Sequence, residues 1–355
     1  MRPIPMADIG ASGARSAPPV LSVRGLKTYY HQDEGIVRAV DGASFVLHPG
    51  KTLGIVGESG CGKSVSARSI LRIVERPGRI ESGEILLART APDGMTEIVD
   101  LVQLDADSEA MRSIRGREIA LIFQEPMTSL SAFYTVGNQI MEAITLHSRL
   151  NKREARERTI ELLRMVGIPR PERRIDEYPF QLSGGLRQRV MIAMALACDP
   201  RVLIADEPTT ALDVTTQAQI LDLLRSLQEE RGLALILITH DMGVIAEMAD
   251  DVVVMYLGRA VEKGPVDAIF HAPKHPYTKA LLRSIPNILA EPRTKLATIS
   301  GSIPHPYDRP PGCPFHPRCP DFRPGTCDRA MPALTSQGED REVACFLYDA
   351  AEATA

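Results

Sequence analysis

Leu182-Ser183-Gly184-Gly185-Leu186-Arg187-Gln188-Arg189 is the stretch that decides the fold of this chain of 355 residues. A glycine-rich loop over 57–64 lies upstream of it, and an apolar strand with two acids at its end, over 202–207, follows it. Ser183 stands just before an apolar helix predicted over 186–197, so its hydroxyl and the following N–H groups can point at an anion. The three segments in this order predict an α/β nucleotide-binding domain.

The upstream loop, Gly57-Glu58-Ser59-Gly60-Cys61-Gly62-Lys63-Ser64, fits the pattern G-x-x-x-x-G-K-[ST]. It follows a short apolar strand over 52–56 and precedes a predicted helix over 64–74, which is the context that the pattern requires. Glycines permit the sharp turn that brings successive N–H groups against a phosphate, and the helix N-terminus adds positive potential. We therefore expect Lys63 to reach the β- and γ-phosphates of a nucleotide and Ser64 to be a ligand of Mg²⁺.

The downstream strand over 202–206 ends in Asp206, and Glu207 follows at once. An open α/β sheet presents such residues to ligands at the carboxyl ends of its strands. We expect Asp206 to hold Mg²⁺, directly or through water, and Glu207 to act as the general base that polarises the attacking water. Two surface acids at a strand end are the alternative interpretation.

In this order, the loop, the Ser183 stretch and the acidic strand resemble the ATP-binding cassette (ABC) ATPases, and Pro208 to Asp213 resembles the loop that follows the catalytic acid in that family. The resemblance implies a P-loop NTPase cassette with a RecA-like core, an antiparallel β subdomain and a helical subdomain. It also implies that Ser183 and Gly184, with Gly185 beside them, bind the γ-phosphate of an ATP held by the opposite subunit. Two cassettes would then be needed for one complete site.

Four further positions acquire roles only through this resemblance. Gln124 matches the Q-loop residue, which senses Mg²⁺ and the γ-phosphate and couples to the membrane domain. Asp213 matches the D-loop, which crosses the dimer interface, and His240 matches the switch histidine, which contacts the γ-phosphate. Tyr30, with Tyr29 as the near alternative, stands where an aromatic ring would stack on adenine. A lone histidine or a tyrosine pair in such places is more often structural than catalytic.

The sequence pattern predicts three parts along the chain. Residues 1–20 are rich in Pro, Ala, Ser and Gly and have no apolar core of a signal peptide, so we expect a disordered extension. Residues 21–270 are expected to form the cassette, with edge strands over 21–27 and 36–47, a surface insertion over 90–97 and a helical subdomain over about 125–185. The family docks its membrane partner on that subdomain. Residues 271–355 form a proline-rich C-terminal region.

Composition excludes some classes of function. The net charge of −4 and the pI near 6.1 do not favour nucleic acid as a partner. The sequence has no apolar run near the roughly eighteen residues that span a bilayer, so we expect membrane association to come through other subunits.

Four of the six cysteines lie in the C-terminal region, at Cys313, Cys319, Cys327 and Cys345. Disulfides are disfavoured because an ATPase belongs in the reducing cytosol. Four thiols in a region poor in core-forming residues favour a metal that supplies folding energy. Their spacing resembles neither the tight pairs of zinc sites nor the common ferredoxin run, so spacing alone leaves the metal open.

Two segments of the C-terminal region make the resemblance more specific. His275-Pro276-Tyr277-Thr278 and Gly312-Cys313-Pro314-Phe315-His316-Pro317-Arg318-Cys319 resemble the C-terminal extension of the oligopeptide and dipeptide importer ATPases. In members of that group the four cysteines hold a [4Fe–4S] cluster, and the resemblance implies the same here. Zinc is the runner-up, and four free thiols without a metal are the remaining alternative.

The resemblance implies an ATP-hydrolysing subunit of a peptide importer that uses ATP and Mg²⁺. Its expected partners are a second ATPase subunit, which makes a heterodimer, two membrane permease subunits and an extracytoplasmic solute-binding protein. The expected location is the cytoplasmic face of the bacterial inner membrane. Nickel complexes and oligosaccharides are alternative cargoes. ABC ATPases that act on nucleic acid or ribosomes are a different class, disfavoured because Lys63 and Ser183 are only 120 positions apart without a coiled coil between them.

Overall fold

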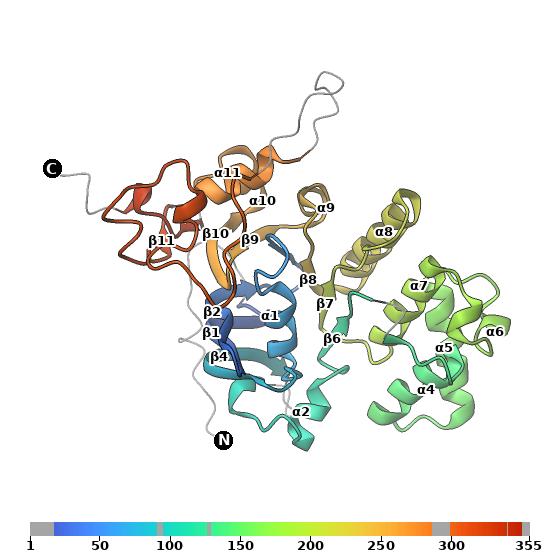
Figure 1. Cartoon of the computed structure of the whole chain (residues 1–355). Coiled ribbons are helices and arrows are strands. Elements are labelled where there is room, and N and C mark those ends of the chain that lie inside the picture. The colour runs from blue at the N-terminus through green and yellow to red at the C-terminus, as the bar shows by residue number, and fades with distance from the viewer. Residues whose placement is uncertain (1–17, 91–94, 126–128, 286–298, 339, 350–355) are drawn as a thin grey trace. The chain divides into compact units, whose positions relative to one another are not determined.

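The computed structural model describes residues 18–90, 95–125, 129–285, 299–338 and 340–349, and the chain divides into two compact units (Figure 1). The first unit comprises 1–46, 52–102 and 239–355, and the second comprises 47–51 and 103–238. Each unit carries a separate share of the predicted site residues. Within the described ranges, none of the helices combines the length and the apolarity that crossing a membrane requires.

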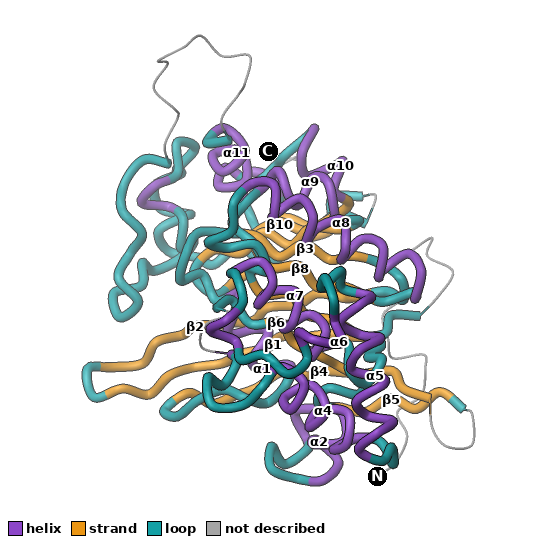
Figure 2. The backbone as a smooth tube through the Cα atoms, turned by 90° about the vertical axis from the view of Figure 1, so that its right-hand side faces the viewer, coloured by secondary structure: helices purple, strands orange, loops and turns teal. Residues whose placement is uncertain are grey.

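An antiparallel sheet opens the first unit (Figure 2). Its strands lie in the order β2 (Gly35–Leu47), β1 (Leu21–Gln32), β4 (Gly78–Thr90) and β5 (Thr96–Asp100). Leu21 pairs with Leu87 and Val23 with Ile85, and all four are buried, because residues that alternate along a strand share one face. The two edge strands were predicted, and both extend further into the hairpin turn than expected.

The predicted surface insertion over 90–97 is only partly an insertion. Thr96 and Glu97 belong to β5 and pair with Thr90 and Arg89 of β4. Residues 91–94 lie outside the described residues. The sequence pattern did not predict β5, because this strand begins with the polar residues Thr96 and Glu97 and its apolar residues, Ile98 and Val99, come later.

The rest of the first unit is built on strands of a mixed sheet, in which β10 pairs antiparallel with β9. β3 (Thr52–Val56) pairs in parallel with β9 (Asp251–Tyr256), and the strand order is β11-β12-β10-β9-β3. Both strands are almost entirely buried and apolar, as strands covered on two faces are. The remaining elements are α1 (Lys63–Ile70), α9 (Met242–Met248), β10 (Arg259–Pro265), α10 (Val266–His271), α11 (Pro276–Arg283), β11 (Thr335–Ser336) and β12 (Glu342–Val343).

The C-terminal region is part of this sheet and not a separate appendage. β12 pairs with β10 through Glu262 and Val343, and the Ala344 N–H donates to the Val261 carbonyl at 2.9 Å. The segment that carries the cysteines is therefore anchored to the same sheet as β3, the strand that leads into the glycine-rich loop.

The second unit contains three parallel strands and a group of helices. β6 (Ile119–Ile122), β7 (Val202–Asp206) and β8 (Ala234–Ile238) lie in the order β8-β7-β6, and α8 (Val214–Arg231) connects β7 to β8. The helix begins at the cap residue Asp213 and ends at Gly232, whose φ of 62° is the left-handed conformation that glycine adopts without strain.

Helices α4 (Val136–His147), α5 (Lys152–Met165), α6 (Pro171–Arg174) and α7 (Gly184–Ala195) of the second unit gather in the green part of Figure 1. The short helix α2 (Glu109–Ile114) belongs to the same unit. Within the range predicted as a helical subdomain, α4 and α5 are separate helices, because Asn151 forms a capping box with Glu154 and begins α5. α4, α5 and α7 pack on one another through buried side chains such as Ile140, Leu162 and Val190.

Candidate phosphate-binding and catalytic site

The glycine-rich loop connects β3 to α1 and depends on two glycines. A side chain at Gly57, whose φ is 151°, would place its Cβ 2.2 Å from the carbonyl oxygen of Met255. At Gly62, with φ of 98°, a Cβ would lie 2.1 Å from the carbonyl oxygen of Ala39. Gly62 is also the N-cap residue of α1, so the loop ends at the N-terminus of this helix. This is the geometry of an anion site.

Lys63 is held inside this loop. Only 5% of its surface is exposed, and its ammonium group donates to the carbonyl oxygens of Gly57 at 2.8 Å and Glu58 at 3.2 Å. A cation in this position can bind the phosphates of a nucleotide with little loss of side-chain freedom, because burial has already ordered it. Cys61, also predicted to belong to the loop, is buried, and its N–H donates to the Glu58 carbonyl at 3.3 Å.

His240 lies in the same unit as the loop. It follows Thr239, whose N–H donates to the Ile55 carbonyl of β3 at 3.3 Å, and precedes Asp241, which caps α9. The His240 side chain is exposed. The structure therefore brings the predicted histidine to the neighbourhood of the strand that leads into the phosphate loop.

The second unit brings together Gln124 and Glu207. The Gln124 side-chain amide donates to a carboxylate oxygen of Glu207 at 3.0 Å, and the Thr210 hydroxyl donates to the same oxygen at 2.9 Å. Glu207 has a φ of 48°, a conformation that is costly for a residue with a side chain and that concentrates at functional sites. Asp206 stands just before it at the end of β7 and is 6% exposed.

The predicted signature residues lie at the start of α7. Ser183 caps this helix, and both Ser183 and Gly184 are exposed. Gly185 is close to α8, since a Cβ there would lie 2.6 Å from a methyl group of Thr216. Asp213 caps α8 by accepting from the hydroxyl of Thr216 at 2.7 Å and from its N–H at 2.9 Å, and these bonds lower the pKa of Asp213. Thr216 thus joins the signature stretch to the predicted D-loop residue.

Tyr30 is not among the described residues that line the cavity beside the phosphate loop. Its ring packs over Gly78, and burial raises the pKa of its hydroxyl. A cavity of about 280 Å³ opens beside Gly60, lined among others by Val37, Leu257 and Tyr307, and neither tyrosine of the predicted pair is among its described lining residues. The Tyr29 hydroxyl instead donates to Asp41 at 2.7 Å. Stacking of adenine on Tyr30 stays a prediction.

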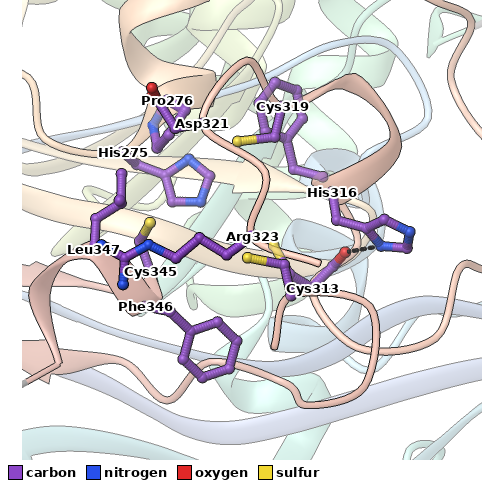
Figure 3. Close-up of a pocket in the computed structure, with 12 residues that line it drawn as sticks. His275, Pro276, Cys313, His316, Cys319, Asp321, Arg323, Cys345, Phe346 and Leu347 are labelled. Atoms are coloured by element: carbon purple, nitrogen blue, oxygen red, sulfur yellow. Dashed lines mark hydrogen bonds between the residues drawn. The ribbon is translucent and has the colours of Figure 1, made fainter. Parts of the chain in front are cut away.

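The four C-terminal cysteines converge. They line one small cavity of about 10 Å³, together with His275 and Phe315 (Figure 3). Burial raises the pKa of Cys319 to about 12 and that of Cys345 to about 11, so these thiols are neutral near pH 7. Four thiols are the right donor set for an iron–sulfur cluster. Over the described ranges, however, the His, Cys, Asp and Glu side chains form no group of three or more that could hold a metal ion.

Two residues that sequence reasoning missed contact the phosphate loop directly. Arg318 forms two hydrogen bonds to the carboxylate of Glu58, at 2.7 and 3.0 Å, and the Tyr277 hydroxyl accepts from the Glu58 N–H at 2.8 Å. The bonds with Glu58 raise the pKa of the Arg318 guanidinium. Both residues belong to the quoted C-terminal motifs, but only the folded chain reveals what they touch.

Comparison with known proteins gives matches along most of the chain. A profile described as "ABC transporter" matches residues 40–210, and one described as "Oligopeptide/dipeptide transporter, C-terminal region" matches residues 261–327. The chain is 48% identical to a putative peptide import ATP-binding protein of Brucella ovis, over 94% of this chain and 98% of the relative. It is also 48% identical to the dipeptide transport ATP-binding protein DppD of Escherichia coli, over 94% and 99%.

Solved structures match the cassette part. Two structures of MJ0796, described as a dimeric ABC transporter cassette and as a dimeric post-hydrolysis state bound to ADP and Pi, give TM-scores of 0.60 and 0.59. Their sequences are 29% and 28% identical to this chain, and each match covers 69% of this chain and 98% of that chain.

Proposed function

The chain belongs to the ABC transporter ATPases, and we propose that within this family it powers the import of peptides. It is the ATP-hydrolysing subunit of an ABC importer. The observation that carries the peptide proposal is the match to the oligopeptide/dipeptide transporter C-terminal region, together with 48% identity to a dipeptide transport protein over 94% of the chain. In the proposed assembly the transported molecule contacts the solute-binding protein and the permeases and not this chain. A transport assay is therefore the test of the peptide proposal.

A strain that lacks the gene provides this assay, complemented with wild type or with Glu207→Gln. We expect uptake of labelled dipeptides and oligopeptides to return with wild type only. The cargo would instead be nickel complexes or oligosaccharides if their uptake depended on the presence of the gene while peptide uptake did not.

The proposed chemistry is attack of water on the γ-phosphorus of ATP, which gives ADP and phosphate. Lys63 and the loop N–H groups would bind the phosphates, Ser64, Asp206 and Gln124 would be the residues that hold Mg²⁺, and Glu207 would accept a proton from the attacking water. The hydrogen bond between Gln124 and Glu207 supports this proposal, because it orients the carboxylate.

Two substitutions separate binding from chemistry. Lys63→Ala should abolish tight ATP binding, since it removes the cation that the loop encloses. Glu207→Gln should retain ATP binding and lower kcat by about 10²–10⁴-fold, the usual contribution of a general base. Full turnover by Glu207→Gln would remove this residue from the base role.

We further propose that two cassettes share each ATP, with Ser183, Gly184 and Gly185 of one subunit on the γ-phosphate held by the other. Exposure of Ser183 and Gly184 at the start of a helix supports this proposal. The proposed assembly adds a different second ATPase, two permeases and a solute-binding protein, and places the chain at the cytoplasmic face of the membrane. Co-purification of the tagged chain from membranes, with the subunits identified by mass spectrometry, tests the heterodimer directly.

The four cysteines are proposed to hold a [4Fe–4S] cluster. Bonds from the four thiolates to iron would then cross-link the C-terminal region. Their convergence on one cavity supports this, whereas their arrangement does not form a site for a single ion. Iron near four per chain in anaerobically purified protein, with thiolate-to-iron absorption, is the expected result. Zinc in its place, or colourless protein without iron, would refute the cluster.

A further inference from the structure

Glu58 places a carboxylate within the anion-binding loop. The loop pattern leaves this position open, because the phosphates are bound by backbone N–H groups and by the lysine. A free carboxylate here would repel the phosphates of ATP, since two like charges a few ångströms apart repel strongly near a protein surface. The structure pairs this carboxylate with a cation from the C-terminal region, 260 positions further along the chain.

The pair has the geometry of a strong interaction. Arg318 donates through both terminal nitrogens, Nη1 to Oε2 at 2.7 Å and Nη2 to Oε1 at 3.0 Å. The side chains of Arg318 and Glu58 are 4% and 22% exposed. A planar guanidinium that binds both oxygens of a carboxylate fixes orientation as well as neutralising charge.

Arg318 is itself held in place by several contacts. Its Nε donates to the Ser300 carbonyl at 3.1 Å, and its guanidinium lies 5.8 Å from the ring centre of Tyr256 and 6.0 Å from that of Phe315. The rings of Tyr256, Tyr277 and Phe315 pack together with centres 4.7 to 5.3 Å apart and are 0–1% exposed. These contacts hold the guanidinium in place independently of the loop.

A second contact fixes the backbone of the same loop residue. The Glu58 N–H donates to the Tyr277 hydroxyl at 2.8 Å, and Tyr277 is fully buried in α11. One residue of the phosphate loop is thus attached to the C-terminal region by its side chain and by its backbone. Arg318 directly precedes Cys319, one of the four cysteines that line the cavity.

We propose that Arg318 and Tyr277 are positioning residues of the nucleotide site: they neutralise and orient Glu58, and so hold the phosphate loop in its binding conformation before ATP arrives. The C-terminal region is then required for nucleotide affinity as well as for its own fold. This inference rests on the proposed nucleotide role of the loop.

The expected effect falls on affinity and not on the chemical step. If the binding-competent fraction of the loop falls to about one tenth, the apparent affinity falls about tenfold. Once ATP is bound, the phosphates themselves hold the loop. Arg318→Gln should therefore raise KM for ATP by about tenfold with kcat within about twofold. Tyr277→Phe, which removes only the hydroxyl, should act in the same direction by a smaller factor.

The decisive variant is the double substitution of Glu58→Gln with Arg318→Gln. Without the carboxylate there is no charge to neutralise, so the double variant should have a lower KM than Arg318→Gln alone. If Arg318 had only a structural role, Arg318→Gln would raise KM by the same factor in wild type and in Glu58→Gln. Equal KM values for Arg318→Gln with and without Glu58→Gln would overturn the inference.

Arg341→Gln is the matched control. Arg341 is another buried arginine of the C-terminal region and is paired with Glu262 of β10, which is fully buried. This variant should lower the thermal unfolding midpoint while KM for ATP stays near wild type. A tenfold rise in KM with Arg341→Gln would show that any damage to the region weakens binding, which also refutes the specific role. All KM values are measured on the complex with the second ATPase subunit and the permeases, and absence of ATPase activity from the wild-type complex would instead refute the proposed function.

Discussion

Asp41 of β2 lies at the centre of a partly buried ion-pair network outside the nucleotide site. Its carboxylate accepts from the Tyr29 hydroxyl at 2.7 Å, from Arg309 at 2.8 Å and from Arg259 at 3.2 Å. Its side chain is 10% exposed, and that of Arg309 is 14% exposed. Asp41→Asn keeps the size of the side chain but leaves two partly buried arginines without their shared counter-charge.

The magnitude follows from this burial. Removing one partner of a buried ion pair costs roughly 3–5 kcal/mol. We expect about 3 kcal/mol for Asp41→Asn, at the low end, because Arg259 is 30% exposed and water can compensate it. A double cycle with Arg309→Gln should show coupling of about 1–3 kcal/mol, as residues in one network do.

The assay is unfolding followed by far-ultraviolet circular dichroism, since the chain has no tryptophan. Glu84→Gln is the control, because the Arg24–Glu84 pair is 3.7 Å apart with side chains 34% and 53% exposed, and such exposed pairs contribute about 0–1 kcal/mol. An effect of Asp41→Asn no larger than that of Glu84→Gln would refute the reasoning.

The ion-pair network of Asp41 also predicts that stability depends on pH. Burial alone would raise the pKa of Asp41, but the Tyr29 hydrogen bond and the charges of Arg309 and Arg259 outweigh it and hold this pKa below its usual range. The charged carboxylate therefore stabilises the fold fully above the unfolded pKa of about 3.9, and this stability is lost as the pH falls through the lower folded pKa. The gap between wild type and Asp41→Asn should be constant from pH 7 to about 5 and should narrow below about 4.

Three further predictions concern single positions. Ser183→Arg should leave ATP binding to the isolated chain intact and stop hydrolysis; loss of binding would contradict the cross-subunit role. Gly62→Ala should abolish ATP binding, measured by titration, because its Cβ would meet the Ala39 carbonyl, whereas Gly25→Ala, at a positive φ without a clash, should bind normally. In metal-free protein, burial lowers the pKa of His275 to about 3, so stability should fall by about 1.4 kcal/mol per pH unit below about 6.5. His275→Asn should flatten this slope in thermal unfolding, and an unchanged slope would show that His275 is not the titrating group.

Much of the cassette could be predicted because its signals are local. The loop over 57–64, the acid at the end of β7 and the caps Ser183 and Asp213 each depend on a few adjacent residues. The resemblance also named Gln124 and Glu207 separately, and the structure places them 3.0 Å apart. What a local pattern could not give was β5, which begins with polar residues, and the position of Tyr30 over Gly78, which depends on the pairing of β1 with β4.

Contacts of the C-terminal region could not be predicted for a different reason. Its motifs were recognised by their resemblance to a family extension, and its cysteines favoured a metal. The arginine between them carried no signal, since an arginine is usually a solvated charge on the surface. The folded chain brings Arg318 to a loop residue 260 positions away, where it also packs on the rings of Tyr256 and Phe315.

Glu58 shows why such a contact matters for how the chain works. A phosphate loop needs a net positive environment when ATP arrives, and this loop contains a carboxylate whose charge must be cancelled. The chain cancels it with a group from the segment that also carries the cysteines, and not with a second lysine in the loop. Loss of structure around Cys319 would then release Arg318 and leave Glu58 to oppose ATP. An ATPase built in this way binds nucleotide well only when its C-terminal region is folded.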